Sequence, residues 1–172
     1  MTEGLGAVIE GTLHSVEGKG VVRMRCRYET DIDDTWSALT DPQRLARWYG
    51  KVEGDLRVGG EYTAVISISG WDGRGRVEAC APPRQLRVTM WEEVGEESVV
   101  TAELVAEGAH TTLEVEVRGV PLDLVWAYGS GWQIHAENLG AHLAGQSCES
   151  SDARWGELEP SYRAKPVVPL EP

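Results

Sequence analysis

The sequence predicts an α+β domain in which a curved antiparallel sheet of about six to seven strands wraps around a long C-terminal helix. Residues 121–146 are the only long segment with helical periodicity, because Trp132, Ala136, Leu139 and Leu143 fall on one helical face. Almost every earlier segment alternates between apolar and polar residues, as strands with one buried face do. A single helix that follows such strands must bury its apolar side on the sheet.

The predicted strands are short and are joined by short connections, which favours an antiparallel meander. The strongest hairpin signal is Asp72-Gly73, and Pro82-Pro83 ends the strand that follows it. One face of the sheet is polar and the other is apolar, so the apolar face needs a cover. The segments with strand character cover residues 7–16, 20–29, 62–69, 73–80, 86–90, 100–104 and 113–117.

Two short helices are predicted between the second and third of these strands. Thr30 or Asp31 can cap the first helix, and Asp41 can cap the second. Pro42 suits the first position of the second helix, where its missing N–H costs nothing. These two helices and the long one are the elements available to cover the apolar face of the sheet.

The C-terminal part of the chain differs in composition, since it holds four of the eight prolines. We expect Asp152 to Tyr162 to form a turn or two of helix that docks Trp155 and Tyr162. Two end segments are expected to be frayed, residues 1–6 and 165–172. The predicted organisation is thus a domain at residues 7–146 and a partly disordered C-terminal extension at residues 147–172.

Composition excludes several classes of partner. With 28 acidic and 16 basic residues, the chain carries a formal net charge of -12. Nucleic acids and anionic membrane surfaces are bound mainly through Lys and Arg, so neither is an expected partner. The three cysteines are widely spaced and form neither a disulfide framework nor a metal motif. No segment has the length and apolarity of a signal peptide or a membrane span, and we expect a cytoplasmic protein.

Several stretches together resemble one known family. The resemblance covers residues 8 to 145. The family is called "activator of heat-shock-protein-90 ATPase homologue-like". It belongs to the START-like superfamily (SRPBCC), which includes polyketide cyclases. The matching stretches are Trp36-Ser-Ala-Leu-Thr-Asp-Pro42 with Trp48-Tyr49-Gly50, Val58-Gly-Gly60, the Gly75 strand that ends in Pro82-Pro-Arg-Gln-Leu86, the Thr-rich strand at 111–117, and Gly131-Trp132 with Leu139.

The resemblance implies a helix-grip fold, with an antiparallel sheet around the C-terminal helix and often an internal cavity. It therefore favours a protein that binds a small apolar or amphipathic molecule between the sheet and the helix. Two alternatives stay open: a chaperone-associated interaction module and a polyketide cyclase-like enzyme. The eukaryotic chaperone activator has an additional N-terminal domain for which this chain has no room, so we rank a chaperone partner below ligand binding. A homodimer also stays open.

Aromatic side chains with polar edges are the first candidates for a pocket, because apolar pockets are lined by aromatics and a few polar tips. For Trp48, Tyr49, Tyr62 and Tyr128, lining a pocket and filling the core are about equally expected, whereas Trp36 is assigned to the core. His135 either binds a polar ligand group, acts as a general base, or is satisfied by a neighbour at the helix edge. In the cyclase-like alternative, His135 or Tyr128 would be the acid–base group. The predicted pocket residues are Trp48, Tyr49, Tyr62, Ile66, Val88, Met90, Tyr128, Trp132, His135 and Leu139.

Motifs for catalysis, metals and cofactors are weak. Gly129-Ser-Gly131 lacks the spacing of a nucleophile elbow and is interpreted as a loosened helix start. His135 and His142 are separated by about 10.5 Å along a helix, which is too far to ligate one metal ion. We therefore predict no catalytic residue, no metal site and no cofactor, and rank binding ahead of enzymatic activity.

Overall fold

The computed structural model describes residues 7–92, 97–148 and 151–171. The prediction that residues 1–6 are frayed lies outside the described residues. The strands are β1 (Val8–Val16), β2 (Lys19–Tyr28), β3 (Gly50–Gly54), β4 (Glu61–Ile66), β5 (Asp72–Ala81), β6 (Gln85–Trp91), β7 (Ser98–Glu107), β8 (His110–Pro121) and β9 (Val167–Pro169). The helices are α1 (Ile32–Thr40), α2 (Pro42–Trp48), α3 (Val125–Leu143) and α4 (Ser151–Ala164), with a 3₁₀ turn at Leu122–Leu124 before α3.

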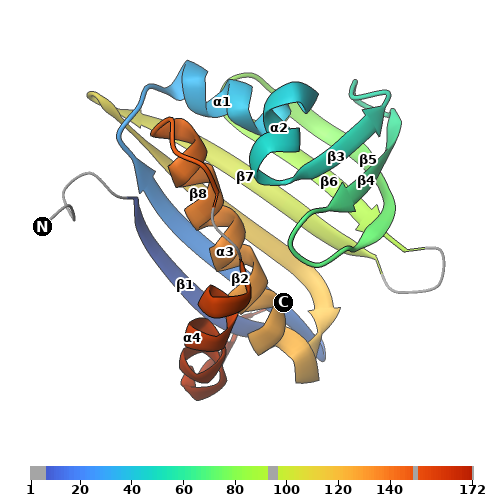
Figure 1. The fold of residues 1–172 in the computed structure, drawn as a ribbon. Coiled ribbons are helices and arrows are strands. Elements are labelled where there is room, and N and C mark those ends of the chain that lie inside the picture. Colours follow the sequence, from blue (N-terminus) through green and yellow to red (C-terminus); the bar gives the residue numbers. More distant parts are fainter. Residues whose placement is uncertain (1–6, 93–96, 149–150, 172) are drawn as a thin grey trace, which may run out of the picture.

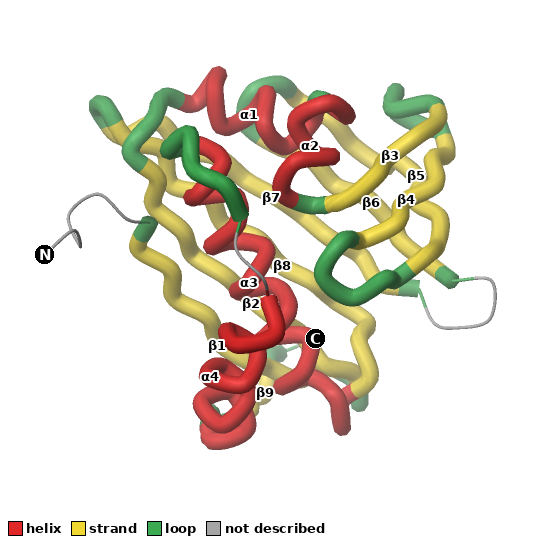
Figure 2. The backbone as a smooth tube through the Cα atoms, in the orientation of Figure 1, coloured by secondary structure: helices red, strands yellow, loops and turns green. Residues whose placement is uncertain are grey.

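In the described part of the chain, the strands form one nine-stranded sheet in the order β3-β4-β5-β6-β7-β8-β2-β1-β9. Neighbouring strands are antiparallel except for β1 and β9, which are parallel. The sheet curves around α3, while α1 and α2 lie over one end (Figure 1). The backbone view shows the helices on one face of the sheet (Figure 2). This arrangement confirms the predicted α+β, helix-grip class.

The sheet has two strands that the alternation pattern did not predict. β3 is a five-residue strand flanked by glycines, and it pairs with β4. β9 is a three-residue strand in a proline-rich segment, and it pairs with β1 from Leu13↔Val167 to Ser15↔Pro169. Both are too short for a period of two to be recognised. Their positions are fixed by the neighbouring strand that accepts them.

The two short helices begin where their capping residues predict. The side chain of Asp31 accepts a hydrogen bond from the backbone N–H of Asp34 at 2.8 Å. Asp41 accepts one from the backbone N–H of Gln43 at 2.9 Å, with Pro42 at the start of α2. Each cap satisfies a backbone donor that a helix N-terminus otherwise leaves without a partner.

The long helix α3 begins at Val125, later than the predicted start at residue 121, because the 3₁₀ turn precedes it. On the predicted apolar face Ala136 and Leu139 are buried, whereas Trp132 and Leu143 are half-buried. Gly129 and Ser130 are also buried within the helix. The interpretation of this glycine-serine segment as a loosened helix start is therefore wrong: it lies inside α3 at a close contact.

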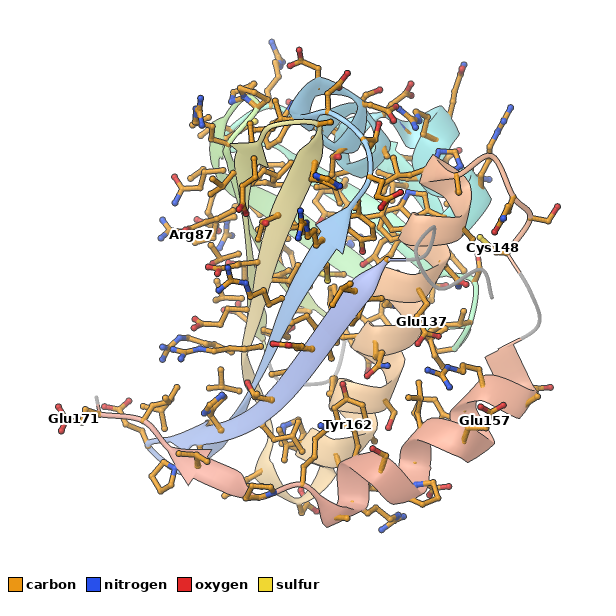
Figure 3. All side chains as sticks on the ribbon, turned by 90° about the vertical axis from the view of Figure 1, so that its left-hand side faces the viewer. Arg87, Glu137, Cys148, Glu157, Tyr162 and Glu171 are labelled. Atoms are coloured by element: carbon orange, nitrogen blue, oxygen red, sulfur yellow. The ribbon has the colours of Figure 1, made fainter. Side chains whose placement is uncertain are left out.

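The C-terminal extension packs on the domain. The docking expected of Trp155 and Tyr162 is confirmed, and the helix that carries them, α4, has 14 residues, more than a turn or two. Tyr162 is almost fully buried, and its hydroxyl donates a 2.6 Å hydrogen bond to the side-chain carbonyl of Gln133 on α3. The expectation that residues 165–172 are frayed is wrong for Val167–Pro169, which reaches the sheet edge beside β1 (Figure 3). None of the helices in the described part of the chain is long and apolar enough to cross a membrane.

Candidate ligand-binding site

A cavity of about 210 Å³ lies between the sheet, the two short helices and α3. Its walls are the inward-facing side chains of the strands, the inner sides of α1 and α2, and one side of α3. Almost all of these side chains are apolar, as expected where a helix covers an apolar sheet face without filling the space. We call this space the inner cavity.

Most of the predicted pocket residues meet at the inner cavity. Those that line it are Trp48, Tyr49, Tyr62, Val88, Met90, Trp132, His135 and Leu139. Ile66 and Tyr128 do not line it but face an adjoining open space. Trp36, which we assigned to the core, is half-buried and lines the inner cavity.

The prediction missed cavity residues that carry no chemical signature. They come from the middle of several strands and from the short helices, among them Met24, Cys26, Leu45, Val77, Leu86, Val100 and Ala102. The alternation of the strands places most of them on the apolar face of the sheet. That signal identifies an inward position, but it does not separate a residue that lines a void from one that packs against another side chain.

The adjoining space is an open groove of about 920 Å³ between the start of β5, the N-terminal half of α3 and the start of α4. We call it the outer groove. Four residues line both spaces and form the wall between them: Tyr49, Met90, Trp132 and His135. A molecule held in the inner cavity would therefore have to pass this wall to reach the solvent through the groove.

His135 lies at the centre of this wall. Its ring is 4.9 Å from that of Tyr49 and 5.3 Å from that of Trp132, measured between centroids. Burial lowers the pKa of His135 to about 4, so the ring is neutral at pH 7. Its Nδ1 atom is buried and has no hydrogen-bond partner among the described residues. The alternative in which a neighbour satisfies this histidine therefore does not match the structure.

Two phenols accompany the histidine. Burial and the neighbouring Tyr62 raise the pKa of Tyr49, and burial raises the pKa of Tyr62 to about 12. Both hydroxyls are therefore protonated at neutral pH and can donate a hydrogen bond. Among the described residues, the Tyr49 hydroxyl makes only a long contact of 3.9 Å with the sulfur of Met90. These groups can orient a polar atom of a ligand, but none is a strong base or nucleophile.

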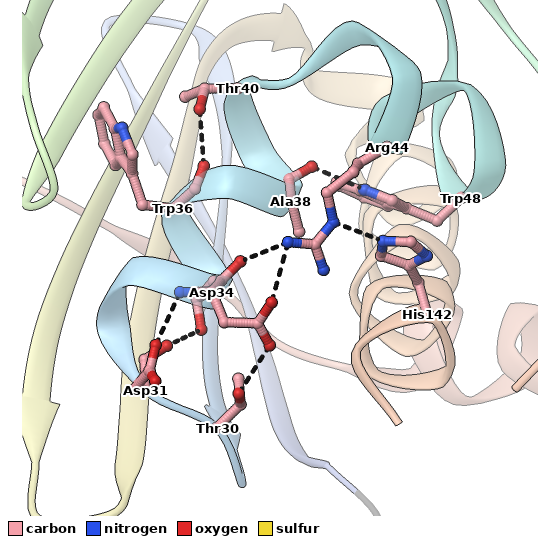
Figure 4. A network of polar contacts seen from close by, with 10 residues as sticks. Thr30, Asp31, Asp34, Trp36, Ala38, Thr40, Arg44, Trp48 and His142 are labelled. Carbon is pink, nitrogen blue, oxygen red and sulfur yellow. Dashed lines mark hydrogen bonds and ion pairs between the residues drawn. The ribbon is translucent and has the colours of Figure 1, made fainter. Parts of the chain in front are cut away.

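A polar network joins the three helices at one end of the cavity (Figure 4). Arg44 on α2 donates to Oδ1 of Asp34 on α1 at 2.9 Å and to Nε2 of His142 on α3 at 3.0 Å. Trp48 donates from its indole to the carbonyl of Ala38 at 2.9 Å. This network joins α1 and α2 to the C-terminal half of α3.

The two histidines of α3 have separate surroundings. His135 is part of the wall between the inner cavity and the outer groove, whereas His142 accepts a hydrogen bond from Arg44 near the helix C-terminus. No group of three or more His, Cys, Asp or Glu side chains suitable for a metal ion occurs in the part of the chain that the structure describes.

An antiparallel sheet wrapped around a C-terminal helix, with an apolar cavity between them, defines a helix-grip domain of the START-like class. A family model described as "Activator of Hsp90 ATPase homolog 1-like protein" matches residues 29–144. This match covers more than half of the sequence, and the chain belongs to that family. It confirms the resemblance found in the sequence.

Solved structures with the same fold include CalU16 from Micromonospora echinospora. Its crystal structure is 27% identical, with a TM-score of 0.73, covering 92% of this chain and 96% of that chain. DynU16, described as a putative protein in the dynemicin biosynthetic locus, is 25% identical with a TM-score of 0.68, covering 75% of this chain and 49% of that one.

A more distant likeness is to PFC0360w from Plasmodium falciparum, described as an HSP90 activator. It is 22% identical with a TM-score of 0.51, covering 59% of this chain and 74% of that chain, and it shows the fold alone. No curated protein matches the chain.

Proposed function

We propose that this protein binds a small apolar or amphipathic molecule in the inner cavity. The observation that carries this proposal is Nδ1 of His135, which lies in the wall of a mostly apolar cavity and has no hydrogen-bond partner among residues 7–92, 97–148 and 151–171. Buried polar atoms in proteins nearly always have hydrogen-bond partners, and an exception at a cavity wall favours a partner supplied by a ligand. Family membership supports the same function, because the helix-grip class is a ligand-binding class.

The size of the cavity limits the ligand. An engineered apolar cavity of roughly 150 Å³ takes up benzene, so a cavity of about 210 Å³ has room for one ring or a short alkyl chain. A larger molecule would have to extend past His135 into the outer groove. The ligand is therefore either small and apolar or amphipathic with a part outside the cavity.

The alternative function, a chaperone-associated interaction module, is supported only by the descriptions of the family and of one similar structure. The family description refers to Hsp90 ATPase activators, and PFC0360w is described as one, but its similarity to this chain shows only the fold. No surface among the described residues favours that partner over a ligand in the cavity. Ligand binding is therefore the function that we take forward.

A fluorescent, uncharged probe tests the proposal. N-phenyl-1-naphthylamine becomes brighter in apolar surroundings. Its phenyl ring is of a size for the inner cavity, and its naphthyl group would extend past His135 into the outer groove, so we expect saturable binding to the purified protein. Ala102 is buried on β7 and lines the inner cavity, so Ala102→Leu should fill part of it and weaken probe binding about tenfold or more. The matched control is Ala106→Leu on the same strand, because Ala106 is exposed and does not line the cavity.

The stability of the two variants completes the test. Because Ala102→Leu places its extra atoms in an empty space, it should change the free energy of unfolding by no more than about 1 kcal/mol, below the usual cost of overpacking. Equal probe binding by both variants and the unmodified protein would contradict the proposal. A large destabilisation by Ala102→Leu would also contradict it, since the position would then be filled rather than open.

A further inference from the structure

We propose that the ligand carries an organic cation, such as a protonated amine, which lies in the outer groove while its apolar part fills the inner cavity. This inference rests on the proposed function and specifies the ligand class. It comes from the charges, the aromatic side chains and the shared wall of the two spaces.

The outer groove is continuous with the inner cavity. Tyr49, Met90, Trp132 and His135 line both, so a ligand that passes this wall has one end in each space. The groove is larger, at about 920 Å³ against 210 Å³, and its lining is more polar. An amphipathic molecule would therefore place its polar end in the groove.

The groove is negatively charged. Asp72 at the start of β5, Glu92 after β6 and Asp152 in α4 all line it. Within the described ranges, no lysine or arginine lines the groove, and none of these three carboxylates forms an ion pair. They come from segments far apart in the sequence, so the fold itself brings them to one place. Their combined field favours a cation and opposes an anion.

Aromatic side chains line the same groove. Trp71 faces it from the β4–β5 connection, Tyr128 and Trp132 from α3, and Trp155 from α4. The faces of Trp and Tyr rings attract organic cations, and exposed carboxylates beside them add to this attraction. The combination of indole rings and unpaired carboxylates is suited to an amine more than to a neutral alcohol.

His135 provides independent evidence that a polar group of the ligand reaches the wall between the inner cavity and the outer groove. The residue is only 8% exposed, and its Nδ1 atom has no partner among the described residues. Because the ring is neutral at pH 7, it does not repel a cation in the groove. A neutral imidazole has one nitrogen that accepts and one that donates, so it can bind either a ligand donor or a ligand acceptor.

Three probes of equal chain length test the charge preference: octylamine, octanol and octanoate. Each competes with N-phenyl-1-naphthylamine for the protein at pH 7 and low salt. We expect octylamine to displace the probe at about five- to tenfold lower concentration than octanol, from the sum of weak ion-pair and cation–π contributions. Octanoate should be the weakest of the three. Added salt at about 0.5 M should reduce the advantage of octylamine, because exposed charges are screened.

Variants of the groove locate the effect. Asp72→Asn combined with Asp152→Asn should remove most of the octylamine advantage and leave octanol binding unchanged. Glu103→Gln is the net-charge control for the single variant Asp72→Asn, because each removes one negative charge and Glu103 is exposed on the outer face of β7, away from the groove. It should leave the octylamine advantage intact. Circular dichroism of each variant checks that the fold is kept, and the single variant Asp72→Asn serves if the double variant does not fold.

The outcomes separate this inference from the proposed function. If N-phenyl-1-naphthylamine does not bind, the proposed function fails and the inference fails with it. If the probe binds and octanol competes as well as octylamine, the cavity stands and the cation site is overturned. A preference for octanoate would also overturn it. If Glu103→Gln lowers the octylamine advantage as much as Asp72→Asn does, the effect belongs to net charge and the groove assignment is wrong.

Discussion

The hydroxyl of Tyr28 on β2 donates a 2.7 Å hydrogen bond to the backbone carbonyl of Ala136 on α3. Tyr28 is 2% exposed, and Ala136 lines the inner cavity. The bond therefore fixes the position of α3 on the sheet at the level of the site. Because the whole phenol is buried, its hydroxyl has no access to water and needs a protein partner.

Tyr28→Phe should lower the free energy of unfolding by about 1–2 kcal/mol, the usual effect of losing one buried hydrogen bond. Urea unfolding measures the change. Tyr49→Phe is the matched control, since the described residues give its hydroxyl only the 3.9 Å contact with Met90. It should change stability by less than about 0.5 kcal/mol. If the two variants lose the same stability, the Tyr28 bond does not hold the helix.

Two glycines of α3 should respond in opposite ways to alanine. A Cβ atom at Gly129 would lie 2.6 Å from Cδ1 of Tyr162 and 2.8 Å from Cδ2 of Leu13, in the contact between α3, α4 and β1. Gly129→Ala should therefore destabilise the protein by about 1–3 kcal/mol. At Gly131 the nearest atom would be 3.7 Å away, in Trp155, so Gly131→Ala should stabilise by up to about 1 kcal/mol through helix propensity. Thermal unfolding of both variants checks the signs, and a stabilised Gly129→Ala would contradict the close packing.

His135 should make the protein less stable in acid. Its folded-state pKa of about 4 is below the value of about 6.5 in an unfolded chain. Above pH 6.5 the ring is neutral in both states and has no effect. Between about pH 6.5 and pH 4 the unfolded state binds the proton more tightly than the folded state. The free energy of unfolding therefore decreases as the pH is lowered, by about 3 kcal/mol in total. A histidine signal in an NMR titration should have its midpoint near pH 4.

The variant His135→Gln isolates this contribution. His14 and His142 also have pKa values lowered mainly by burial, but both stay in the variant, so their effects cancel in the comparison. The stability of the unmodified protein relative to His135→Gln should decrease between pH 7 and pH 4.5 in urea unfolding. A constant difference over this range, or an NMR midpoint near 6.5, would show that the ring is accessible to protons.

Trp132 and Tyr128 should separate the two parts of the site. Trp132 is half-buried and lines both spaces, so Trp132→Ala should weaken the uncharged probe about tenfold and cost about 2–3 kcal/mol of stability. Tyr128 is 38% exposed and lines only the groove. Tyr128→Ala should weaken octylamine about two- to fivefold, change octanol little, and cost about 1 kcal/mol or less. Equal losses of octanol and octylamine with Tyr128→Ala would place this ring at the apolar end of the ligand.

The sequence predicted the fold of the domain more completely than the residues of the binding site. The alternation in segments such as 100–104 correctly assigned Val100, Ala102 and Leu104 to the inner face, because a strand turns every second side chain to the same side. The caps at Asp31 and Asp41 were also correct, since a cap depends only on its immediate neighbours. Short elements such as β9 were missed, because their pairing partner is distant in the sequence.

The order of the elements, the faces of the strands and the existence of the long helix were determined by the sequence itself, because each depends on local periodicity. Only the tertiary structure decided which inward side chains surround an empty space and which pack against each other, because a cavity depends on the summed volumes of side chains from many elements. It also decided that Asp72, Glu92 and Asp152 meet at one groove, and that Nδ1 of His135 has no hydrogen-bond partner there in the described part of the chain. No local sequence pattern predicts these contacts between distant residues, since they depend on how the helices are placed over the curved sheet.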